Sequence, residues 1–309
     1  MISPIPSLRG RDILDVDDLG REELLAVVDL ALQAKSDPSR LQGGLEGRCI
    51  ALLFEKPSTR TRVSLQAGIF KLGGSSIPLS SGELQLSRGE TLQDTGRVLD
   101  RYVDALAARV FAHRTLVSLA SSMVAPVLNA LSDVAHPMQA FADLMTLKEV
   151  GASSVAYVGD ANNVARSLML ASCMAGLDSR IATPPERSLD PSYAHRCREL
   201  AESFGGRFLI THDPMQAVRG AEAVYTDVWV SMGEEDEERS LVEMLRPYAL
   251  TKELLSHAAD GAVVMHCLPM HRGEEIAAEV ADSDRSIVFE QAENRMHAQN
   301  ALLCAVLGE

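Results

Sequence analysis

The sequence predicts an α/β protein with two doubly wound parallel-sheet domains that are joined by interdomain helices. Three observations support this fold class. Short apolar runs of strand type alternate with helical segments, the alternation restarts after about residue 150, and polar motifs follow the predicted strands. Alternation of strands with helices favours parallel sheets. A length of 309 residues also suits about two domains.

The first half of the chain is expected to run helix, strand, helix, strand. Residues 19–34 are predicted to be helical because Leu24, Leu25, Val28 and Leu32 recur at helical spacing. The later predictions are strands at 49–54, 75–79, 105–110 and 127–130, helices at 62–72, 91–100, 116–122 and 136–150, and a polar loop at 80–90.

The second half repeats the alternation. Strands are predicted at 154–160, 180–183, 207–211, 223–227 and 262–266, with a helix at 163–175, further helices between the later strands and a last helix at 294–307. We therefore expect one domain at 1–135 and a second at 136–290. The segment 291–309 is expected to form a C-terminal helix that packs back on the first domain.

Charge and composition exclude several classes of function. The chain is 46% apolar and 23% charged, with a net charge of −14, which makes a general surface for nucleic acid or anionic membrane improbable. Basic residues that cluster against this background indicate a local anionic ligand. No apolar run reaches the roughly 18 residues of a membrane span, and the first residues resemble neither a signal peptide nor a transit peptide.

The five cysteines are odd in number and widely spaced, and none forms a C-x-x-C pair. This pattern indicates neither a zinc site nor a disulfide framework. Free thiols are typical of a reducing compartment, so we expect a cytoplasmic protein without a bound metal.

Residues 57–62, Pro-Ser-Thr-Arg-Thr-Arg, stand where a predicted strand gives way to a helix. The first N–H groups of a helix lack backbone partners and can bind a phosphate. The hydroxyl groups of Ser58 and Thr59 add donors, and Arg60 offers a planar fork that matches phosphate oxygens. The alternative is an ordinary helix cap made by Ser58 or Thr59.

Arg109 and His136 also stand at element ends. Arg109 ends a predicted strand, so its side chain is expected to point into the crevice, unless it serves a structural ion pair. His136 precedes Pro137 at a helix start, which disfavours the protonated imidazole. A neutral His136 can donate to a carbonyl oxygen and Gln139 can bond an amide, although both residues could merely serve the helix start.

Two motifs of the second half follow predicted strands. Gly159-Asp160-Ala161-Asn162-Asn163 occupies the place of a dinucleotide fingerprint, but G-x-G-x-x-G is absent, which argues against NAD or FAD. The two asparagines could bind a polar small molecule or cap the helix. Asp227 could neutralise an ammonium group, and Ser231-Met232-Gly233 suits a loop that closes on a ligand.

His266-Cys267-Leu268-Pro269 ends another predicted strand. Cys267 could be an apolar filler, a nucleophile or a polar contact to substrate. Arg295 at the start of the last helix could form a salt bridge or bind a ligand. Together, the cationic groups, the aspartate and the lack of a cofactor loop favour a doubly anionic small substrate that reacts with an amine.

These motifs resemble those of the aspartate/ornithine carbamoyltransferase family over nearly the whole chain. Ser58-Thr59-Arg60-Thr61-Arg62 and His136-Pro137-x-Gln139 resemble motifs of the whole family. Asp227-x-x-x-Ser231-Met232-Gly233 and His266-Cys267-Leu268-Pro269 resemble its ornithine branch. An aspartate enzyme would carry basic residues there for the extra carboxylate, and neither motif has one.

The resemblance implies a role for each matching residue. The first domain would bind carbamoyl phosphate and the second would bind ornithine. The phosphate contacts would be Ser58, Thr59, Arg60, Thr61, Arg109 and Gln85, the last reaching a neighbouring subunit of a homotrimer with shared sites. The carbamoyl contacts would be His136, Gln139, Cys267, Leu268 and Arg295. The ornithine contacts would be Asn163, Asp227, Ser231 and Met232.

The implied reaction is that of a transferase of one-carbon groups, without a cofactor. The δ-amine of ornithine would attack carbamoyl phosphate, giving citrulline and phosphate, as in arginine or urea-cycle metabolism. Arg109, His136 and Thr61 would stabilise the developing oxyanion, and Asp227 and Cys267 would stand near the amine. Putrescine, acetylornithine or aspartate are the alternative acceptors. A dehydrogenase and a silent anion-binding relative are the alternatives from other classes.

Two departures from the family pattern concern loops. The segment 149–154 is shorter than usual, and Ala161 stands where glycine is frequent. Neither removes a residue with an implied role, so we expect both to alter local loop geometry alone.

Overall fold

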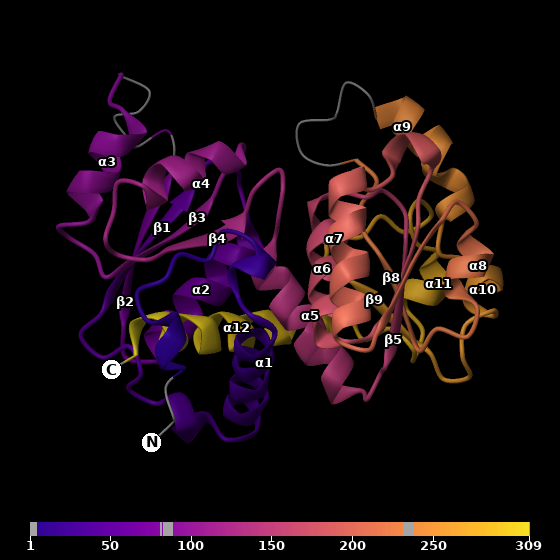
Figure 1. Ribbon diagram of the computed structural model, residues 1–309, viewed down its shortest axis with the longest axis horizontal. Coiled ribbons are helices and arrows are strands. Elements are labelled where there is room, and N and C mark those ends of the chain that lie inside the picture. Colours follow the sequence, from indigo (N-terminus) through magenta and orange to yellow (C-terminus); the bar gives the residue numbers. More distant parts are fainter. Residues whose placement is uncertain (1–4, 81, 83–88, 231–237, 309) are drawn as a thin grey trace. The chain divides into compact units, whose positions relative to one another are not determined.

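The computed structural model describes residues 5–80, 82, 89–230 and 238–308 of the chain. The chain divides into two compact units. Unit 1 comprises Met1–Met145 and Asn294–Glu309, and unit 2 comprises Thr146–Glu293. The divisions fall inside two helices, α5 (Pro137–Glu149) and α12 (Val288–Leu307). Figure 1 shows both units as sheets flanked by helices.

Unit 1 contains a four-stranded parallel sheet with the strand order β2-β1-β3-β4. Its strands are β1 (Cys49–Phe54), β2 (Ser75–Ser80), β3 (Ala105–Arg109) and β4 (Val127–Leu131), and its further helices are α1 (Arg21–Ser36), α2 (Thr59–Lys71), α3 (Leu92–Leu99) and α4 (His113–Ala120). Three short 3-10 helices, Pro6–Leu8, Val16–Asp18 and Pro38–Leu41, flank α1.

Alternate strand residues of unit 1 face the two helical layers. Ala51 and Leu53 of β1 pack with Leu106 of β3 and with Leu116 and Leu119 of α4 in one apolar cluster. Ile50 and Leu52, which point to the opposite face, are also fully buried. Burial on both faces explains why β1 is apolar throughout.

Unit 2 contains a five-stranded parallel sheet with the order β7-β6-β5-β8-β9. Its strands are β5 (Ser154–Val158), β6 (Asp178–Ala182), β7 (Arg207–Thr211), β8 (Ala223–Thr226) and β9 (Val263–His266). Its helices are α6 (Asn163–Ala175), α7 (Pro191–Ser203), α8 (Pro214–Val218), α9 (Glu238–Leu245), α10 (Lys252–Leu255) and α11 (Ala278–Ala281), with 3-10 helices at Pro185–Arg187 and Arg246–Tyr248. Helices α6 and α7 lie on one face of this sheet, and α8, α10 and α11 lie on the other (Figure 1).

The predicted fold class is confirmed, and the differences concern element ends. Helix α4 begins at His113, three residues before the predicted start, because the Asp133 carboxylate accepts the His113 N–H at 2.7 Å. Helix α12 begins at Val288, ahead of the predicted residue 294, and β6 covers 178–182 where 180–183 was expected. Among the described helices, none is long and apolar enough to cross a membrane.

Candidate functional site

In each unit, the predicted site residues follow strands that lie on either side of the point where the strand order reverses. In unit 1 the chain passes from β1 outward to β2 and then returns to β3 on the other side of β1. In unit 2 it passes from β5 through β6 to β7 and then returns to β8 beside β5. Ligands of open α/β sheets bind outside the carboxyl ends of strands at such a switch point. Each unit therefore holds one set of candidate residues.

The turn after β1 combines a helix cap with exposed donors. Ser58 is the N-cap of α2, and its hydroxyl oxygen accepts the Thr61 N–H at 3.4 Å. Thr59 and Arg60 are exposed at the first turn of the helix, whereas Thr61 is fully buried. The capping and anion-binding interpretations of this turn are therefore compatible, because the cap leaves Thr59 and Arg60 accessible to an anion.

Arg60 differs from several other arginines of the chain. Arg11, Arg48, Arg180, Arg187 and Arg272 each form an ion pair with a carboxylate. Within the described part of the chain no carboxylate pairs with Arg60. A salt bridge thus does not explain this side chain, and its guanidinium is available to a phosphate.

Two further arginines of unit 1 are buried. Arg109 ends β3 opposite Phe54 of β1, at a register shift between β3 and β4. Arg295 lies on α12, and its Nη2 donates to the Thr61 hydroxyl oxygen at 2.6 Å. Because α12 is far from α2 in the sequence, this contact could not be read from either segment alone. It places a buried cation directly behind the capped turn.

His136 lies immediately before α5 and is 3% exposed. Burial lowers the pKa of its imidazole well below the usual value, and the positive charges of Arg295 and Arg109 lower that pKa further. The imidazole is therefore neutral at physiological pH, as expected from the sequence. The main cause is burial, whereas the sequence argument rested on the helix start. A neutral imidazole can donate one hydrogen bond to a carbonyl oxygen without competing for the proton.

Gln139, one turn into α5, is held by a residue that sequence reasoning missed. Its Nε2 donates to the Asp143 Oδ1 at 2.8 Å, and both side chains are buried. This bond fixes the amide orientation, because a carboxylate accepts and does not donate. Gln139 Oε1 is buried and has no partner among the described residues. The oxygen is thus a preset acceptor for an N–H group. The spacing of four residues on one helix was the only sequence signal for Asp143.

Asn129 is a second missed residue and shapes the turn before His136. It is fully buried on β4, and its Nδ2 donates to the carbonyl oxygens of Leu14 at 2.7 Å and Ala135 at 3.2 Å. The Ser132 hydroxyl oxygen accepts the Ala135 N–H at 3.2 Å in the same turn. These bonds fix the backbone that precedes His136, and a buried asparagine inside a predicted strand was their only sequence signal.

In unit 2, the turn after β5 connects to Asp227 after β8. Asn162 is the N-cap of α6, with its Oδ1 accepting the N–H groups of Val164 and Ala165 at 3.0 Å each. Its Nδ2 donates to Asp227 Oδ2 at 2.9 Å. Asn162 therefore serves as a cap and also orients Asp227. Asn163, the predicted ornithine contact, is the first residue of α6.

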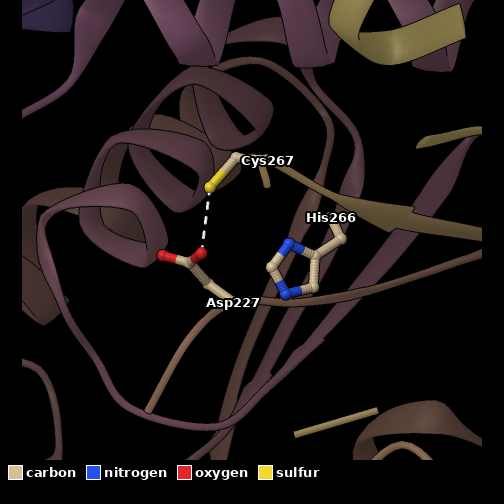
Figure 2. Close-up of side chains that lie close together, drawn as sticks. All are labelled: Asp227, His266 and Cys267. Carbon is tan, nitrogen blue, oxygen red and sulfur yellow. Dashed lines mark hydrogen bonds between the residues drawn. The ribbon is translucent and has the colours of Figure 1, made fainter. Parts of the chain in front are cut away.

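Asp227 and Cys267 are brought together from the ends of β8 and β9. The Cys267 thiol donates to Asp227 Oδ1 at 2.9 Å, and Figure 2 shows the sulfur directed at the carboxylate. Cys267 is partly exposed, whereas Asp227 is buried. Both carboxylate oxygens of Asp227 thus have a fixed donor, one from Cys267 and one from Asn162. The two residues expected near an amine therefore lie side by side, and their role toward that amine stays a prediction.

His266 stands beside this pair but bonds elsewhere. Its Nδ1 accepts the Leu268 N–H at 2.9 Å, and its Nε2 lies 3.1 Å from Glu275 Oε1. Since Nδ1 accepts a bond, the proton resides on Nε2 and points at the buried Glu275. Leu268 has a φ of 63°, in the left-handed region that leucine rarely adopts. His266 therefore stabilises an unusual backbone next to Cys267.

A metal ion does not fit these residues. The ligand atoms of Asp227, His266 and Cys267 lie within 4.8 Å of one another, which is close enough for a shared ion. Histidine binds a metal through a free ring nitrogen. Both ring nitrogens of His266 are engaged, by Leu268 and by Glu275. We therefore assign no metal to this set, and the sequence expectation of a metal-free site stays a prediction.

The electrostatic field of the unit 2 set is negative. Tyr157 is buried on β5 and stacks on Tyr225, with ring centroids 5.8 Å apart. Burial raises the pKa of the Tyr157 phenol well above its usual value, and negative charge at Asp227 and Asp160 raises that pKa further. The carboxylates that oppose a phenolate at Tyr157 favour a cation, so this edge of the sheet suits an ammonium group.

Three predicted contacts, Gln85, Ser231 and Met232, lie outside the described residues. The other predicted residues fall into the two sets. Unit 1 holds Ser58, Thr59, Arg60, Thr61, Arg109, His136, Gln139 and Arg295, and unit 2 holds Asn163, Asp227, Cys267 and Leu268.

Comparison with known proteins gives both units a match in one family. Residues 11–149 match the family model described as aspartate/ornithine carbamoyltransferase, carbamoyl-P binding domain. Residues 152–306 match its counterpart, the Asp/Orn binding domain.

Single proteins are similar over nearly the whole chain. The ornithine carbamoyltransferase of Thermococcus kodakarensis is 46% identical, with 98% of each chain covered. The anabolic ornithine carbamoyltransferase of Pyrococcus furiosus is 45% identical at the same coverage. The solved structure of ornithine carbamoyltransferase from Pyrococcus furiosus superposes with a TM-score of 0.93 at 44% identity, covering 99% of each chain.

Proposed function

We propose that this chain, which belongs to the aspartate/ornithine carbamoyltransferase family, transfers the carbamoyl group of carbamoyl phosphate to the δ-amine of L-ornithine. The products are L-citrulline and phosphate. The observation that carries the proposal is the opposite polarity of the two sets. Unit 1 presents cations around a neutral histidine, and unit 2 presents an aspartate with a thiol. A phosphate donor and an amine acceptor need these two environments.

Unit 1 is proposed to bind carbamoyl phosphate. Arg60, Ser58 and Thr59 suit the phosphate, because they form an accessible cluster of donors at a helix start. Arg109, Arg295 and Thr61 would lie behind it. The family model for this part of the chain, described as a carbamoyl-P binding domain, supports the assignment. Gln85 stays a proposed phosphate contact from a neighbouring subunit.

The carbamoyl end is proposed to meet His136 and Gln139. The neutral His136 donates to the carbonyl oxygen, and Gln139 Oε1 accepts from the carbamoyl amide. As the amine attacks, negative charge grows on that carbonyl oxygen. Donors that are already fixed in place, as His136 is by its burial, stabilise such charge without further reorganisation. Cys267 and Leu268 stay proposed contacts of the same group.

Unit 2 is proposed to bind ornithine. Asp227 lies in a negative field that attracts an ammonium group, and both of its oxygens have fixed donors. The δ-amine must lose a proton before it attacks, since its pKa in water is close to that of lysine, about 10. Asp227 and Cys267 are the proposed neighbours of that proton. Asn163, Ser231 and Met232 stay proposed contacts of the α-amino acid end.

The chemical step forms a carbon–nitrogen bond and breaks a carbon–oxygen bond and a nitrogen–hydrogen bond. The neutral δ-nitrogen bonds to the carbamoyl carbon, the carbon–oxygen bond to phosphate breaks, and the nitrogen releases one proton. Phosphate leaves with its electron pair into the Arg60 cluster. Holding two substrates in reactive geometry can supply roughly 7–11 kcal/mol of the barrier reduction. Orientation is therefore proposed as the largest contribution of the two sets together.

We also propose a homotrimer, and unit 1 carries the supporting surface. Of the eleven exposed large apolar side chains among the described residues, eight lie in unit 1. They include Phe70, Tyr102 and Val124, each more than 70% exposed. Burial of these side chains in an interface between subunits would remove them from water. Light scattering should give three times the mass of the chain, and a monomer at micromolar concentration would contradict the proposal.

The proposed setting is arginine metabolism in the cytoplasm. The five cysteines are free thiols, which agrees with a reducing compartment. The relative from Pyrococcus furiosus is described as anabolic.

An assay with competing acceptors tests the proposed function. Purified protein and carbamoyl phosphate are incubated with L-ornithine, putrescine, acetylornithine or aspartate, and the carbamoylated product is quantified. We expect citrulline from ornithine, and turnover at least 100-fold lower with the other three. Equal or better turnover with any of them would reassign the acceptor. Lack of product with all four would favour a silent anion-binding protein.

A further inference from the structure

The turn that carries Asn162 is held by an arginine that the proposed function does not use. Asp160 lies two residues before Asn162, and its side chain is 3% exposed. The guanidinium of Arg187 donates two parallel hydrogen bonds to the Asp160 carboxylate, from Nε to Oδ1 at 2.8 Å and from Nη2 to Oδ2 at 2.7 Å. The Ala161 N–H also donates to the Arg187 carbonyl oxygen at 3.2 Å. Arg187 thus binds the turn through its side chain and its backbone.

A continuous series of bonds runs from this arginine to the predicted amine contact. Arg187 binds Asp160, Asn162 follows in the same turn, Asn162 binds Asp227, and Asp227 accepts from Cys267. At its start the turn is also tied to β6, because the Gly159 N–H donates to the Ala182 carbonyl oxygen at 3.1 Å. Gly159 has a φ of 138°, a conformation open to glycine and strained for other residues. The Arg187–Asp160 contact therefore adds to the helix cap in fixing the position of Asn162.

The geometry of the Arg187–Asp160 contact matters as well as its charge. A bidentate arginine–carboxylate pair fixes the plane and the direction of the carboxylate, whereas a lysine ammonium acts as a point charge. Arg187 is partly exposed, with 28% of its side chain accessible. Any cation at the position of Arg187 would neutralise the charge of Asp160. The two short parallel bonds indicate a requirement for orientation.

We propose that Arg187 is a positioning residue for the amine half of the reaction: through Asp160 it fixes the turn at 159–163, and so keeps Asn162 bonded to Asp227. This inference rests on the proposed function, because it assigns Asp227 to the ornithine side. Arg187 itself touches no substrate in this scheme. Its removal should impair the use of ornithine and leave the binding of carbamoyl phosphate unchanged.

Unit 2 contains a matched control for this arginine. Arg180 donates the same pair of parallel hydrogen bonds to the Asp178 carboxylate, from Nε to Oδ1 at 3.1 Å and from Nη2 to Oδ2 at 2.6 Å. That pair lies at the beginning of β6, whereas the candidate residues follow strand ends. Arg180→Lys therefore removes a comparable fork from the same unit without touching the turn at 159–163.

The first experiment compares steady-state kinetics of Arg187→Lys and Arg180→Lys. For Arg187→Lys we expect the KM for ornithine to rise, or kcat to fall, by about 10- to 100-fold, since small misplacement of a reacting group has effects of that size. The KM for carbamoyl phosphate should stay within twofold of wild type. Arg180→Lys should match wild type in all three constants. Equal effects of both variants on ornithine would overturn the proposal.

The second measurement does not depend on enzymatic activity. It therefore tests the positioning role of Arg187 independently of the proposed function. The alkylation rate of Cys267 by iodoacetamide is measured against pH in the full-length protein, with the peptide identified by mass spectrometry. The thiolate is the form that reacts, and a carboxylate that accepts the thiol proton disfavours it, so the thiol should react more readily once that partner has moved. We expect the Cys267 profile to shift in Arg187→Lys and not in Arg180→Lys. An unchanged profile in Arg187→Lys would contradict the positioning role, even if wild type formed no citrulline.

Discussion

Unit 1 and unit 2 use the same parallel α/β arrangement to build sites of opposite charge. In both, the candidate residues follow strands at a switch in strand order. Unit 1 places Arg109 and Arg295 near a histidine kept neutral by burial, and Arg60 is exposed at the start of α2. Unit 2 places Asp227, Asp160 and Glu275 around a tyrosine whose ionisation they oppose. The fold therefore sets where a ligand binds, and a few side chains at strand ends set which ligand.

The largest expected effect is the loss of a cation from unit 1. Arg60→Ala and Arg109→Ala should each lower the turnover of citrulline formation by about 100- to 1000-fold or more, the usual cost of losing one preorganised donor. Arg60 is exposed, so its replacement should leave the unfolding midpoint unchanged. Arg40→Ala, which removes an exposed pair with Asp37, is the control and should keep full activity. Near-normal turnover of Arg60→Ala at saturating substrates would remove Arg60 from the site.

The matching change in unit 2 is Asp227→Asn. It keeps the shape of the side chain but removes the charge that attracts the amine, so kcat/KM for ornithine should fall by about 100-fold, or roughly 2.7 kcal/mol of transition-state stabilisation. The control is Asp213→Asn at the start of α8, where the aspartate serves as a helix cap. If Asp227→Asn weakened carbamoyl phosphate and ornithine equally, the proposed separation of the two sets would be wrong.

A smaller effect is expected at Gln139. Gln139→Leu removes the acceptor that Asp143 orients, and an unmatched hydrogen bond in a buried site costs about 1–3 kcal/mol, so kcat/KM for carbamoyl phosphate should fall roughly 10- to 100-fold. Gln299→Leu replaces another buried glutamine of unit 1, whose amide has no partner among the described residues. It should retain activity. A Gln139→Leu enzyme with unaltered kinetics would show that the amide contact is made elsewhere.

The smallest effect concerns stability and pH. The pKa of His136 is depressed in the folded protein, so below about pH 6.5 the unfolded chain binds a proton that the folded chain does not. Folding stability therefore falls as the pH drops through 6.5, with a slope of up to about 1.4 kcal/mol per pH unit from this residue. Above that pH the contribution is constant. The urea midpoint of His136→Gln should depend less on pH between 7 and 5.5 than that of wild type. Equal pH dependence would mean that His136 protonates in the folded state.

Much of this comparison could be predicted from the sequence, because strand ends are local features. The runs at 49–54 and 154–158 are apolar, and the polar motifs after them stand out against the chain. The positions of Arg60, His136 and Asp227 needed no further information. The resemblance to a known family supplied their roles, and the residues alone left each of them with a structural alternative.

What the sequence did not predict depends on contacts between distant segments. Arg295 on α12 donates to Thr61, which lies more than two hundred residues earlier in the chain. Arg187, which follows β6 in the sequence, donates to Asp160, which precedes β6. Asn129 links the turn before His136 to Leu14, because it donates to the carbonyl oxygens of Ala135 and Leu14. The early start of α4 depends on Asp133, which comes after that helix. These partners can be identified only from the folded structure, because residues that form such hydrogen bonds do not recur at a fixed spacing in the sequence.

If unit 1 binds the phosphate donor and unit 2 the amine acceptor, the two halves can be separated by binding of the donor alone. Freshly dissolved carbamoyl phosphate is titrated calorimetrically, in the absence of ornithine, into wild type, Arg60→Ala and Asp227→Asn. We expect Asp227→Asn to bind the donor as tightly as wild type, whereas Arg60→Ala should bind it at least about 10-fold more weakly. Equal loss in both variants, or unchanged binding in Arg60→Ala, would contradict this assignment.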